Sequence, residues 1–352
     1  MKFQSRVVLC TLLWLSLTNA SHADQSKVVI LATGGTIAGS AETQTQAGYS
    51  SGQVGIDALL SAVPQLGQVA DVSGEQVANV GSQDMNDEIW LKLAERVNAL
   101  AASPGVDGIV ITHGTDTIEE TAYFLNLVVG SDKPVVLTAA MRPSTALSAD
   151  GPLNIFNAVA VAADDKARAR GVLVVVNDDI HGARAITKTH TTDVQTFHSP
   201  ERGLIGRTLY GENMFFRAPY RTNTSDSQFS LAGVTSLPRV DVLYMHANFS
   251  ADLIDSAVAN GAKGLVIAGV GNGNMTADAL SAVQRAIKNN VVVVRSSRVT
   301  AGATGRNVEI KDDEVGTIAS GELNPAKSRV LLQLALLSTR DSKKIQTLFN
   351  QY

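Results

Sequence analysis

Val28-Val29-Ile30-Leu31-Ala32, followed by Thr33-Gly34-Gly35-Thr36, is the segment from which we infer the fold of this chain. The five apolar residues predict a buried strand, and the two glycines predict a tight turn that brings Thr36 to the end of that strand. Residues 108–112 repeat the pattern and run into His113-Gly114-Thr115-Asp116-Thr117. In an open α/β sheet, ligands bind beyond the carboxyl ends of the strands. The two loops therefore predict a small-molecule site that contains threonine hydroxyls.

Apolar runs alternate with helix-like segments along the rest of the chain, which predicts βαβ units and a mainly parallel sheet. Strands are expected at residues 28–32, 108–112, 134–138, 171–176, 240–244, 264–268 and 291–295, and helices at 86–101, 152–163 and 327–337. We interpret residues 217–238, which are polar and lack periodicity, as a linker. The expected fold class is α/β, with a larger N-terminal catalytic domain at 24–216, whose mainly parallel sheet is flanked by helices, and a smaller C-terminal α/β domain at 239–352.

The first 23 residues have the pattern of a secretory signal peptide. Lys2 and Arg6 precede an apolar run at 7–17 that is too short to span a membrane, and small residues around Ala23 mark the expected cleavage point. We therefore expect a periplasmic protein with no membrane association after cleavage. The only cysteine, Cys10, leaves with this segment, so the mature chain has no disulfide.

The charge balance argues against nucleic acid as a partner. The whole chain carries 29 basic and 33 acidic side chains, a net charge of −4, and shows no basic stripe. Removal of Lys2 and Arg6 leaves 27 basic against 33 acidic side chains, a net charge of −6. The histidines after residue 23 lack HxxxH and HxH spacings, so no metal is expected. The Gly34-Gly35 loop is neither a phosphate-binding loop nor a GxGxxG motif, so no nucleotide cofactor is expected.

Each threonine loop also has an ordinary structural interpretation. Thr36 taken alone suits a helix N-cap better than a nucleophile, because a threonine hydroxyl needs a base to take its proton. Asp116 and Glu119 have the spacing of a capping arrangement, and His113 suits a structural role. Lys188 lies in a threonine-rich, weakly charged stretch, which predicts partial burial and a carboxylate partner such as Asp116. Such a unit allows the lysine to act as a base towards a hydroxyl.

Three further segments carry polar side chains that suit a site. Residues 39–55 predict either a mobile lid with Tyr49 as its one aromatic or an ordinary surface loop. Ser82 and Gln83 precede an expected helix, where Ser82 or Asp84 suits the cap and where both Ser82 and Gln83 can hold a polar substrate group. Asn272 and Asn274 lie in a glycine-rich loop after residues 264–268, and the amide of either one suits a substrate carboxylate.

Together these motifs are similar to those of the bacterial L-asparaginases, and most of all to the exported type II enzymes. The resemblance runs from residue 28 to residue 352 and rests on the segments 30–39, 81–84, 111–117, 141–143, 148–152, 187–189, 271–274 and 295–298. It implies hydrolysis of L-asparagine to L-aspartate and ammonia without a cofactor. It also implies a homotetramer whose sites are shared between two subunits.

The resemblance further implies a role for individual residues. Thr36 matches the nucleophile, and Tyr49 matches the tyrosine of a mobile loop beside it. A second polar triad is matched by Thr115, Asp116 and Lys188. Ser82, Gln83 and Asp116 match the residues that hold the α-carboxylate and α-ammonium of the substrate. Asn274 and Glu309 match groups that complete a site in a neighbouring subunit. Gln83 and Asn274 favour asparagine, but one methylene discriminates by only about 1–3 kcal/mol, so some glutaminase activity is expected.

A periplasmic amino-acid-binding protein is the alternative interpretation. Such a protein is also exported, doubly wound and poor in disulfides, but its site needs no nucleophile and it is normally monomeric. The joint presence of Thr36, Thr115, Asp116 and Lys188 favours the enzyme.

Overall fold

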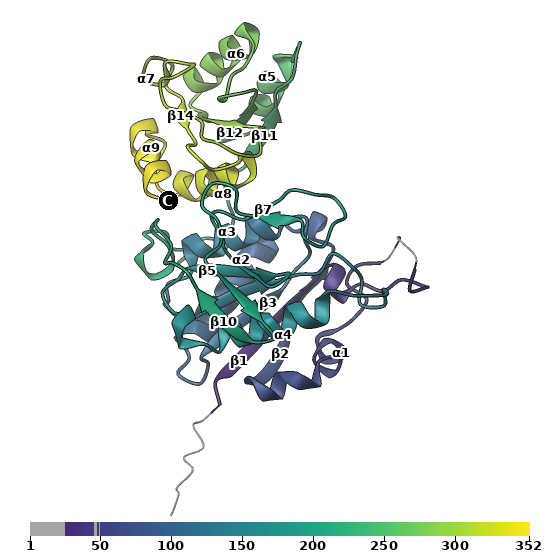
Figure 1. Cartoon of the computed structure of the whole chain (residues 1–352). Coiled ribbons are helices and arrows are strands. Elements are labelled where there is room, and N and C mark those ends of the chain that lie inside the picture. The colour runs from purple at the N-terminus through teal and green to yellow at the C-terminus, as the bar shows by residue number, and fades with distance from the viewer. Residues whose placement is uncertain (1–24, 46–47, 49) are drawn as a thin grey trace, which may run out of the picture.

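The computed structural model of the chain describes residues 25–45, 48 and 50–352, which form two α/β lobes (Figure 1). The N-terminal lobe contains an eight-stranded sheet in the order β10-β9-β6-β5-β4-β3-β1-β2. Strands β2, β1, β3, β4 and β5 run parallel to one another, whereas β6, β9 and β10 extend the sheet by antiparallel pairing. The strands are β1 (Lys27–Gly34), β2 (Asp71–Val80), β3 (Gly108–Thr112), β4 (Val135–Thr138), β5 (Val172–Val176), β6 (Asp179–Gly182), β9 (Gly206–Leu209) and β10 (Glu212–Phe215).

Helices cover both faces of this sheet because its strands are apolar on both sides. Successive strand residues point to opposite faces. Val29 and Leu31 of β1 pack into the core that contains α2 and α3, while Val28 and Ile30 pack into the core that contains α1 and α4. The helices are α1 (Ile56–Ser61), α2 (Asp87–Ala102), α3 (Ile118–Val128) and α4 (Gly151–Ala162).

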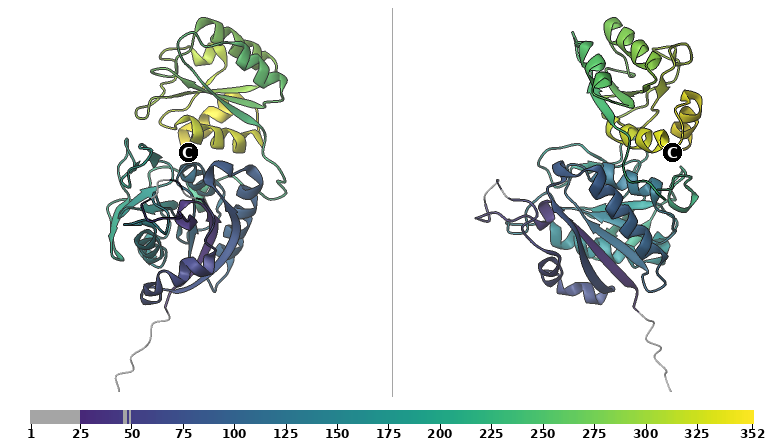
Figure 2. Two further views of the ribbon diagram at one scale, coloured as in Figure 1. Left: turned by 90° about the vertical axis from the view of Figure 1, so that its right-hand side faces the viewer. Right: turned by 180° about the vertical axis from the view of Figure 1, so that it is seen from behind.

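The C-terminal lobe is a smaller layered unit around a parallel sheet in the order β11-β12-β13-β14. Its strands are β11 (Val240–Tyr244), β12 (Gly264–Gly269), β13 (Val292–Ser297) and β14 (Ile318–Ala319). Its helices are α5 (Asp252–Ala259), α6 (Ala277–Lys288), α7 (Asp312–Val315), α8 (Pro325–Leu336) and α9 (Ser342–Gln351). Helices α5 and α6 share a core with one face of the sheet, and α8 lies on the side that faces the N-terminal lobe (Figure 2).

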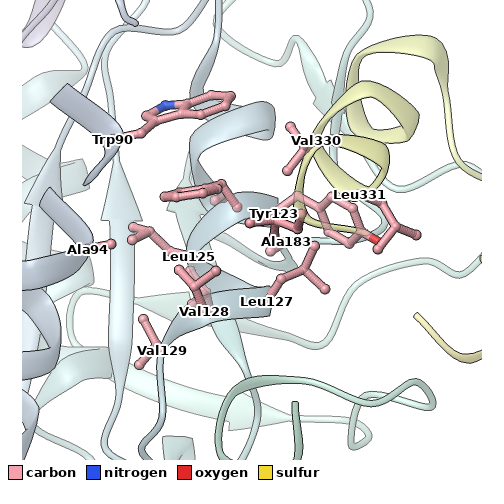
Figure 3. Close-up of a cluster of buried hydrophobic side chains, with 14 of the residues drawn as sticks. Trp90, Ala94, Tyr123, Leu125, Leu127, Val128, Val129, Ala183, Val330 and Leu331 are labelled. Atoms are coloured by element: carbon pink, nitrogen blue, oxygen red, sulfur yellow. The ribbon is translucent and has the colours of Figure 1, made fainter. Parts of the chain in front are cut away.

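One continuous apolar core joins the lobes through α3 and α8. Tyr123 and Leu127 of α3 lie close to Val330 and Leu331 of α8, and all four side chains are buried (Figure 3). The polar rim adds an ion pair in which Arg184 Nη1 lies 3.0 Å from Glu322 Oε2. The lobes therefore pack against each other as parts of one hydrophobic core.

The α/β class, with a larger mainly parallel N-terminal sheet and a smaller C-terminal unit, is confirmed. All seven expected strands are present within one or two residues of their predicted ends. The expected helices also form, at 87–102, 151–162 and 325–336. Between residues 217 and 238 the only regular element is the short 3-10 turn η5 (Thr224–Asp226), and three partly buried apolar residues pack against the main core: Phe229, Leu231 and Leu237.

Candidate active site

Three loops meet at the carboxyl edge of β1 and β3, and glycines make their close contact possible. Gly35 has a φ of 81°, and a Cβ atom on it would lie only 2.4 Å from Gly114 N. A Cβ atom on Gly114 would lie 2.5 Å from Ser82 Oγ. Since real Cβ atoms do not approach so closely, only glycine fits at either position. The fold thus brings the segments that carry Thr36, Ser82 and Thr115 together.

Thr36 begins the 3-10 turn η1 (Thr36–Ala38) and is buried, with 5 % of its surface exposed. The residue in the N-cap position of this turn is Gly35, and no side chain caps it. The N-cap interpretation of Thr36 is therefore wrong. A neighbouring hydroxyl fixes the loop instead: Thr33 Oγ1 donates a hydrogen bond to Thr112 O at 2.8 Å, which ties the end of β1 to the end of β3.

Lys188 joins the second threonine loop through two hydrogen bonds. Its Nζ lies 3.0 Å from Thr115 Oγ1 and 2.7 Å from Asp116 Oδ1. Thr115 is buried, the Lys188 side chain is 18 % exposed and the Asp116 side chain is 59 % exposed. Lys188 comes from the two-residue strand β7 (Thr187–Lys188), which pairs with β8 (Phe197–His198). An amine, a hydroxyl and a carboxylate thus form one connected unit at the sheet edge.

The capping interpretation of Asp116 is also wrong. The N-cap residue of α3 is Thr117, without a capping hydrogen bond, because the Asp116 carboxylate is directed to Lys188. The main-chain N–H of Asp116 donates to Ser82 Oγ at 3.1 Å, and Thr117 Oγ1 donates to Ser82 O at 2.7 Å. Thr117, which sequence reasoning treated only as part of a cap, therefore holds the Ser82 loop against the start of α3.

His113 is structural, as expected. The ring is fully buried, and its Nδ1 donates to Gly114 O at 2.8 Å. The hydroxyl of Thr121 accepts from Trp90 Nε1 at 2.8 Å and lies 2.9 Å from His113 Nε2, to which it donates. Burial lowers the pKa of His113 to about 4, so the ring is neutral at pH 7. These buried hydrogen bonds hold the loop in place, and His113 has a structural role in it.

Ser82 contacts the Lys188 unit through the main-chain N–H of Asp116, and Gln83 follows it in the chain. Ser82 is buried in η3 (Ser82–Asp84), while Gln83 is exposed and donates to Asp84 Oδ2 at 3.3 Å. The α2 cap is neither Ser82 nor Asp84 but Asn86, whose Oδ1 accepts from Ile89 N at 3.0 Å.

Two candidates belong to the C-terminal lobe, and one lies outside the described residues. Asn274 ends a loop after β12, and Glu309 is exposed before α7. Over residues 25–45, 48 and 50–352, no hydrogen bond or ion pair joins either of them to the Lys188 unit. Tyr49 is not among the described residues, so its expected place beside Thr36 stays a prediction.

In the described part of the chain, no group of three or more His, Cys, Asp or Glu side chains has the arrangement of a metal site. Among the helices of this part, none has both the length and the apolar character needed to cross a membrane.

The fold and the loop cluster define a class: a two-lobed α/β protein with a polar small-molecule site at the ends of parallel strands. Comparison with protein families shows which family within this class the chain matches. Residues 27–221 match the family described as "Asparaginase, N-terminal", and residues 239–349 match the "Glutaminase/Asparaginase C-terminal domain". The chain belongs to the asparaginase family.

Individual relatives agree over nearly the whole length. The "Probable L-asparaginase periplasmic" of Haemophilus influenzae is 50% identical, with 99% of each chain covered. The "L-asparaginase 2" of Escherichia coli is 51% identical, with 92% of this chain and 93% of the relative covered. The crystal structure of the "Probable Cytoplasmic L-asparaginase" from Campylobacter jejuni matches with a TM-score of 0.91 at 47% identity, covering 93% of this chain and all of the other.

Proposed function

We propose that this chain is an amidohydrolase that converts L-asparagine to L-aspartate and ammonia, with lower activity on L-glutamine. The observation that carries the proposal is the contact of Lys188 Nζ with Thr115 Oγ1 and Asp116 Oδ1, next to the point where Gly35 and Gly114 approach each other closely. Family membership and the L-asparaginase relatives support the same reaction. The name of the C-terminal family includes glutaminase, which agrees with a site that discriminates incompletely.

In the proposed mechanism, Thr36 Oγ1 attacks the carbon of the side-chain amide. The hydroxyl proton passes to the base, the amide nitrogen leaves as ammonia after taking up a proton, and an ester to Thr36 remains. Water then hydrolyses this ester and releases L-aspartate. The oxyanion of each step needs donors where the charge develops. Over the described residues, the main-chain N–H of Thr115 has no acceptor, so it can supply one of them.

Lys188 is the base of this proposal. In the free enzyme its Nζ contacts the Asp116 carboxylate and the Thr115 hydroxyl. The α-ammonium of a bound amino acid would compete with Lys188 for the same carboxylate. Thr115 accepts a hydrogen bond from Lys188 Nζ and would pass the proton between the reacting groups and this base.

Substrate recognition is proposed to use the remaining candidates. Ser82, Gln83 and Asp116 would hold the α-carboxylate and α-ammonium, and Tyr49 would close over Thr36. In a homotetramer, Asn274 and Glu309 of a neighbouring subunit would complete the site, which agrees with their separation from the Lys188 unit within one chain.

We further propose export as a type II enzyme, with a signal peptide at 1–23, a catalytic domain at 24–216, a linker at 217–238 and a C-terminal domain at 239–352. The charge order around Lys2 and Arg6 supports this, as does the word "periplasmic" in the name of the Haemophilus influenzae relative. The protein should then reach the periplasm and begin at Asp24, which N-terminal sequencing of the periplasmic fraction tests.

Ammonia release from L-asparagine by the purified protein tests the activity. Thr36→Ala should abolish release while L-aspartate still binds, and Thr36→Ser, which keeps a hydroxyl, should retain measurable turnover. Thr347→Ala, at an exposed position of α9, is the matched control and should behave like the unaltered protein. Tight binding of asparagine without any ammonia would favour the amino-acid-binding protein instead, and an unchanged kcat in Thr36→Ala would refute the assigned nucleophile.

A further inference from the structure

Lys327 of α8 is a buried lysine that the mechanism above does not use. Only 2 % of its surface is exposed, although it belongs to the C-terminal lobe and its ammonium crosses into the N-terminal one. Its Nζ donates to the carbonyl oxygen of Ile186 and lies 3.2 Å from Glu119 Oε2. Burial lowers the pKa of Lys327, while Glu119 favours its charged form. A buried ammonium is costly unless it is well paired, so this contact needs an explanation.

The two segments that Lys327 touches are the same two that the Lys188 unit joins. Ile186 lies two residues before Lys188, and Glu119 lies three residues after Asp116. Lys188 Nζ bonds to Asp116 at one end of these segments, and Lys327 Nζ bridges Glu119 and Ile186 at the other. The start of α3 and the strand β7 are therefore connected twice, each time by a lysine ammonium.

The β7 segment lies outside the main sheet. It consists of two residues that pair only with the equally short β8, so the ladder of the main sheet does not hold it. The C-terminal lobe also contacts the residues just before β7, since Arg184 Nε donates to Tyr352 O at 2.5 Å and Arg184 Nη1 pairs with Glu322. The place of Lys188 relative to Thr115 thus depends on contacts made by the C-terminal lobe.

From this arrangement we propose that Lys327 is a positioning residue: by holding Ile186 and Glu119 together from α8, it sets the distance between Lys188 and the Thr115–Asp116 pair. The inference rests on the proposed amidohydrolase function, because it acts through the base of that reaction. It assigns to the C-terminal lobe a part in the catalytic step within its own chain, separate from any contribution to a neighbouring subunit. The α3–α8 packing in Figure 3 is the rigid support for this contact.

Lys327→Met tests the proposal, since it keeps the apolar stem and removes the ammonium. A displacement of about 1 Å in a reacting group lowers rates by roughly 100-fold. We expect kcat to fall by about 10- to 100-fold while KM for L-asparagine changes less than about 3-fold, because Ser82 and Gln83 are untouched and Asp116 stays hydrogen-bonded to Ser82 Oγ through its main-chain N–H. Lys327→Arg should restore part of kcat, since it keeps donors for both partners and a cavity of about 50 Å³ lies beside Lys327.

A second variant separates positioning from stability. Asn324 Oδ1 caps α8 by accepting from Lys327 N at 2.9 Å, and its Nδ2 donates to Glu119 Oε2 at 3.0 Å. Asn324→Ala should lower the melting temperature about as much as Lys327→Met but leave kcat within about 3-fold, because the contact with Ile186 remains. Lys344→Met, at an exposed position of α9, is the neutral control.

Three results would count against the positioning role. These are an unchanged kcat in Lys327→Met, an equal loss of kcat in Asn324→Ala, and a rise in KM at constant kcat. If the unaltered protein releases no ammonia from L-asparagine, the proposed function is wrong, and with it the inference on Lys327. A folded Lys327→Met protein that turns over at the normal rate overturns only the inference on Lys327.

Discussion

Replacement of Arg295 by methionine is expected to destabilise the C-terminal lobe by several kcal/mol. Arg295 and Asp312 form an ion pair whose two side chains are both fully buried. The guanidinium Nε and Nη2 donate to the two Asp312 oxygens at 2.7 and 2.6 Å. The same guanidinium donates to three main-chain carbonyls, those of Asn272, Gly273 and Gly305. Arg295 thus joins the loop that contains Asn274 to the segment that precedes Glu309.

The expected magnitude follows from what the substitution leaves behind. Removal of one partner of a buried ion pair costs about 3–5 kcal/mol, because the other charge stays buried without compensation. Asp312 keeps two donors, Thr317 Oγ1 at 2.6 Å and Asn307 N at 2.8 Å, which places the loss towards the lower end. The double variant Arg295→Met with Asp312→Asn leaves no unpaired ion, so its cost should be smaller than the sum of the single losses by about 1 kcal/mol or more.

Urea unfolding followed by two probes measures this loss and locates it. The tryptophans are at positions 14 and 90, so residues 239–352 contain none, and Trp90 fluorescence reports on the N-terminal lobe. Circular dichroism reports on both lobes. In Arg295→Met, the dichroism transition should move to lower urea by more than the fluorescence transition, because the lost contacts lie in the C-terminal lobe while Trp90 lies in the core that joins the lobes.

A loss below about 1 kcal/mol in Arg295→Met would refute this reasoning, as would strictly additive effects in the double variant. The same substitution should also change the activity through the loops that contain Asn274 and Glu309. If Asn274 and Glu309 complete a site, Arg295→Met should raise KM for L-asparagine, whereas Thr36→Ala should act on kcat.

Three further outcomes follow from contacts in the structure. Lys188→Met should lower kcat by about 100- to 10,000-fold, the usual contribution of a general base, in an ammonia-release assay with saturating asparagine. Gly35→Ala should lower both melting temperature and activity, because its Cβ would overlap the Gly114 backbone, whereas Gly67→Ala, with nothing within 4 Å, should change neither. Burial alone would raise the pKa of Glu322, but hydrogen bonds and charges from two arginines and a tyrosine lower it from 4.5 to about 2. This stabilisation is complete above pH 4.5 and is lost as the pH falls towards 2, so Glu322→Gln should flatten the fall in melting temperature over that range.

Sequence reasoning predicted the central strands well because those strands are buried on both faces. Residues 108–112 and 172–176 are apolar without interruption, which identifies interior parallel strands. Strand β2 was missed because it lies at the sheet edge, where Ser73, Gly74 and Glu75 break the apolar pattern. Strands β9 and β10 were missed for the same reason, since they are short and end the sheet on the other side, whereas β6 was missed because it is only four residues long and contains Asp179, His181 and Gly182. Edge strands bury one face or less, so their sequences carry little periodic signal.

In the candidate site, too, residues placed by a local motif could be predicted, and contacts that depend on tertiary structure were harder to predict. The glycines and threonines of the two loops could be found because a local motif places them at strand ends. The link between Lys188 and Asp116 required a further argument, that a partly buried lysine needs a carboxylate, and the structure contains this pair at 2.7 Å. Local reasoning failed where a side chain had two possible partners: Asp116 suited a helix cap in sequence, but pairing with an ammonium is stronger than capping, and the tertiary partner prevailed.

Lys327 shows where sequence reasoning ends. In the sequence it lies in the first turn of a nearly apolar helix, where a lysine would ordinarily extend into solvent. Its burial arises because α8 packs on α3 and brings Glu119 and the Ile186 carbonyl to the same point, and both partners lie more than 100 residues away along the chain. No periodicity or motif encodes such a meeting, since it depends on how two lobes pack. A residue of this kind becomes visible only in the folded chain.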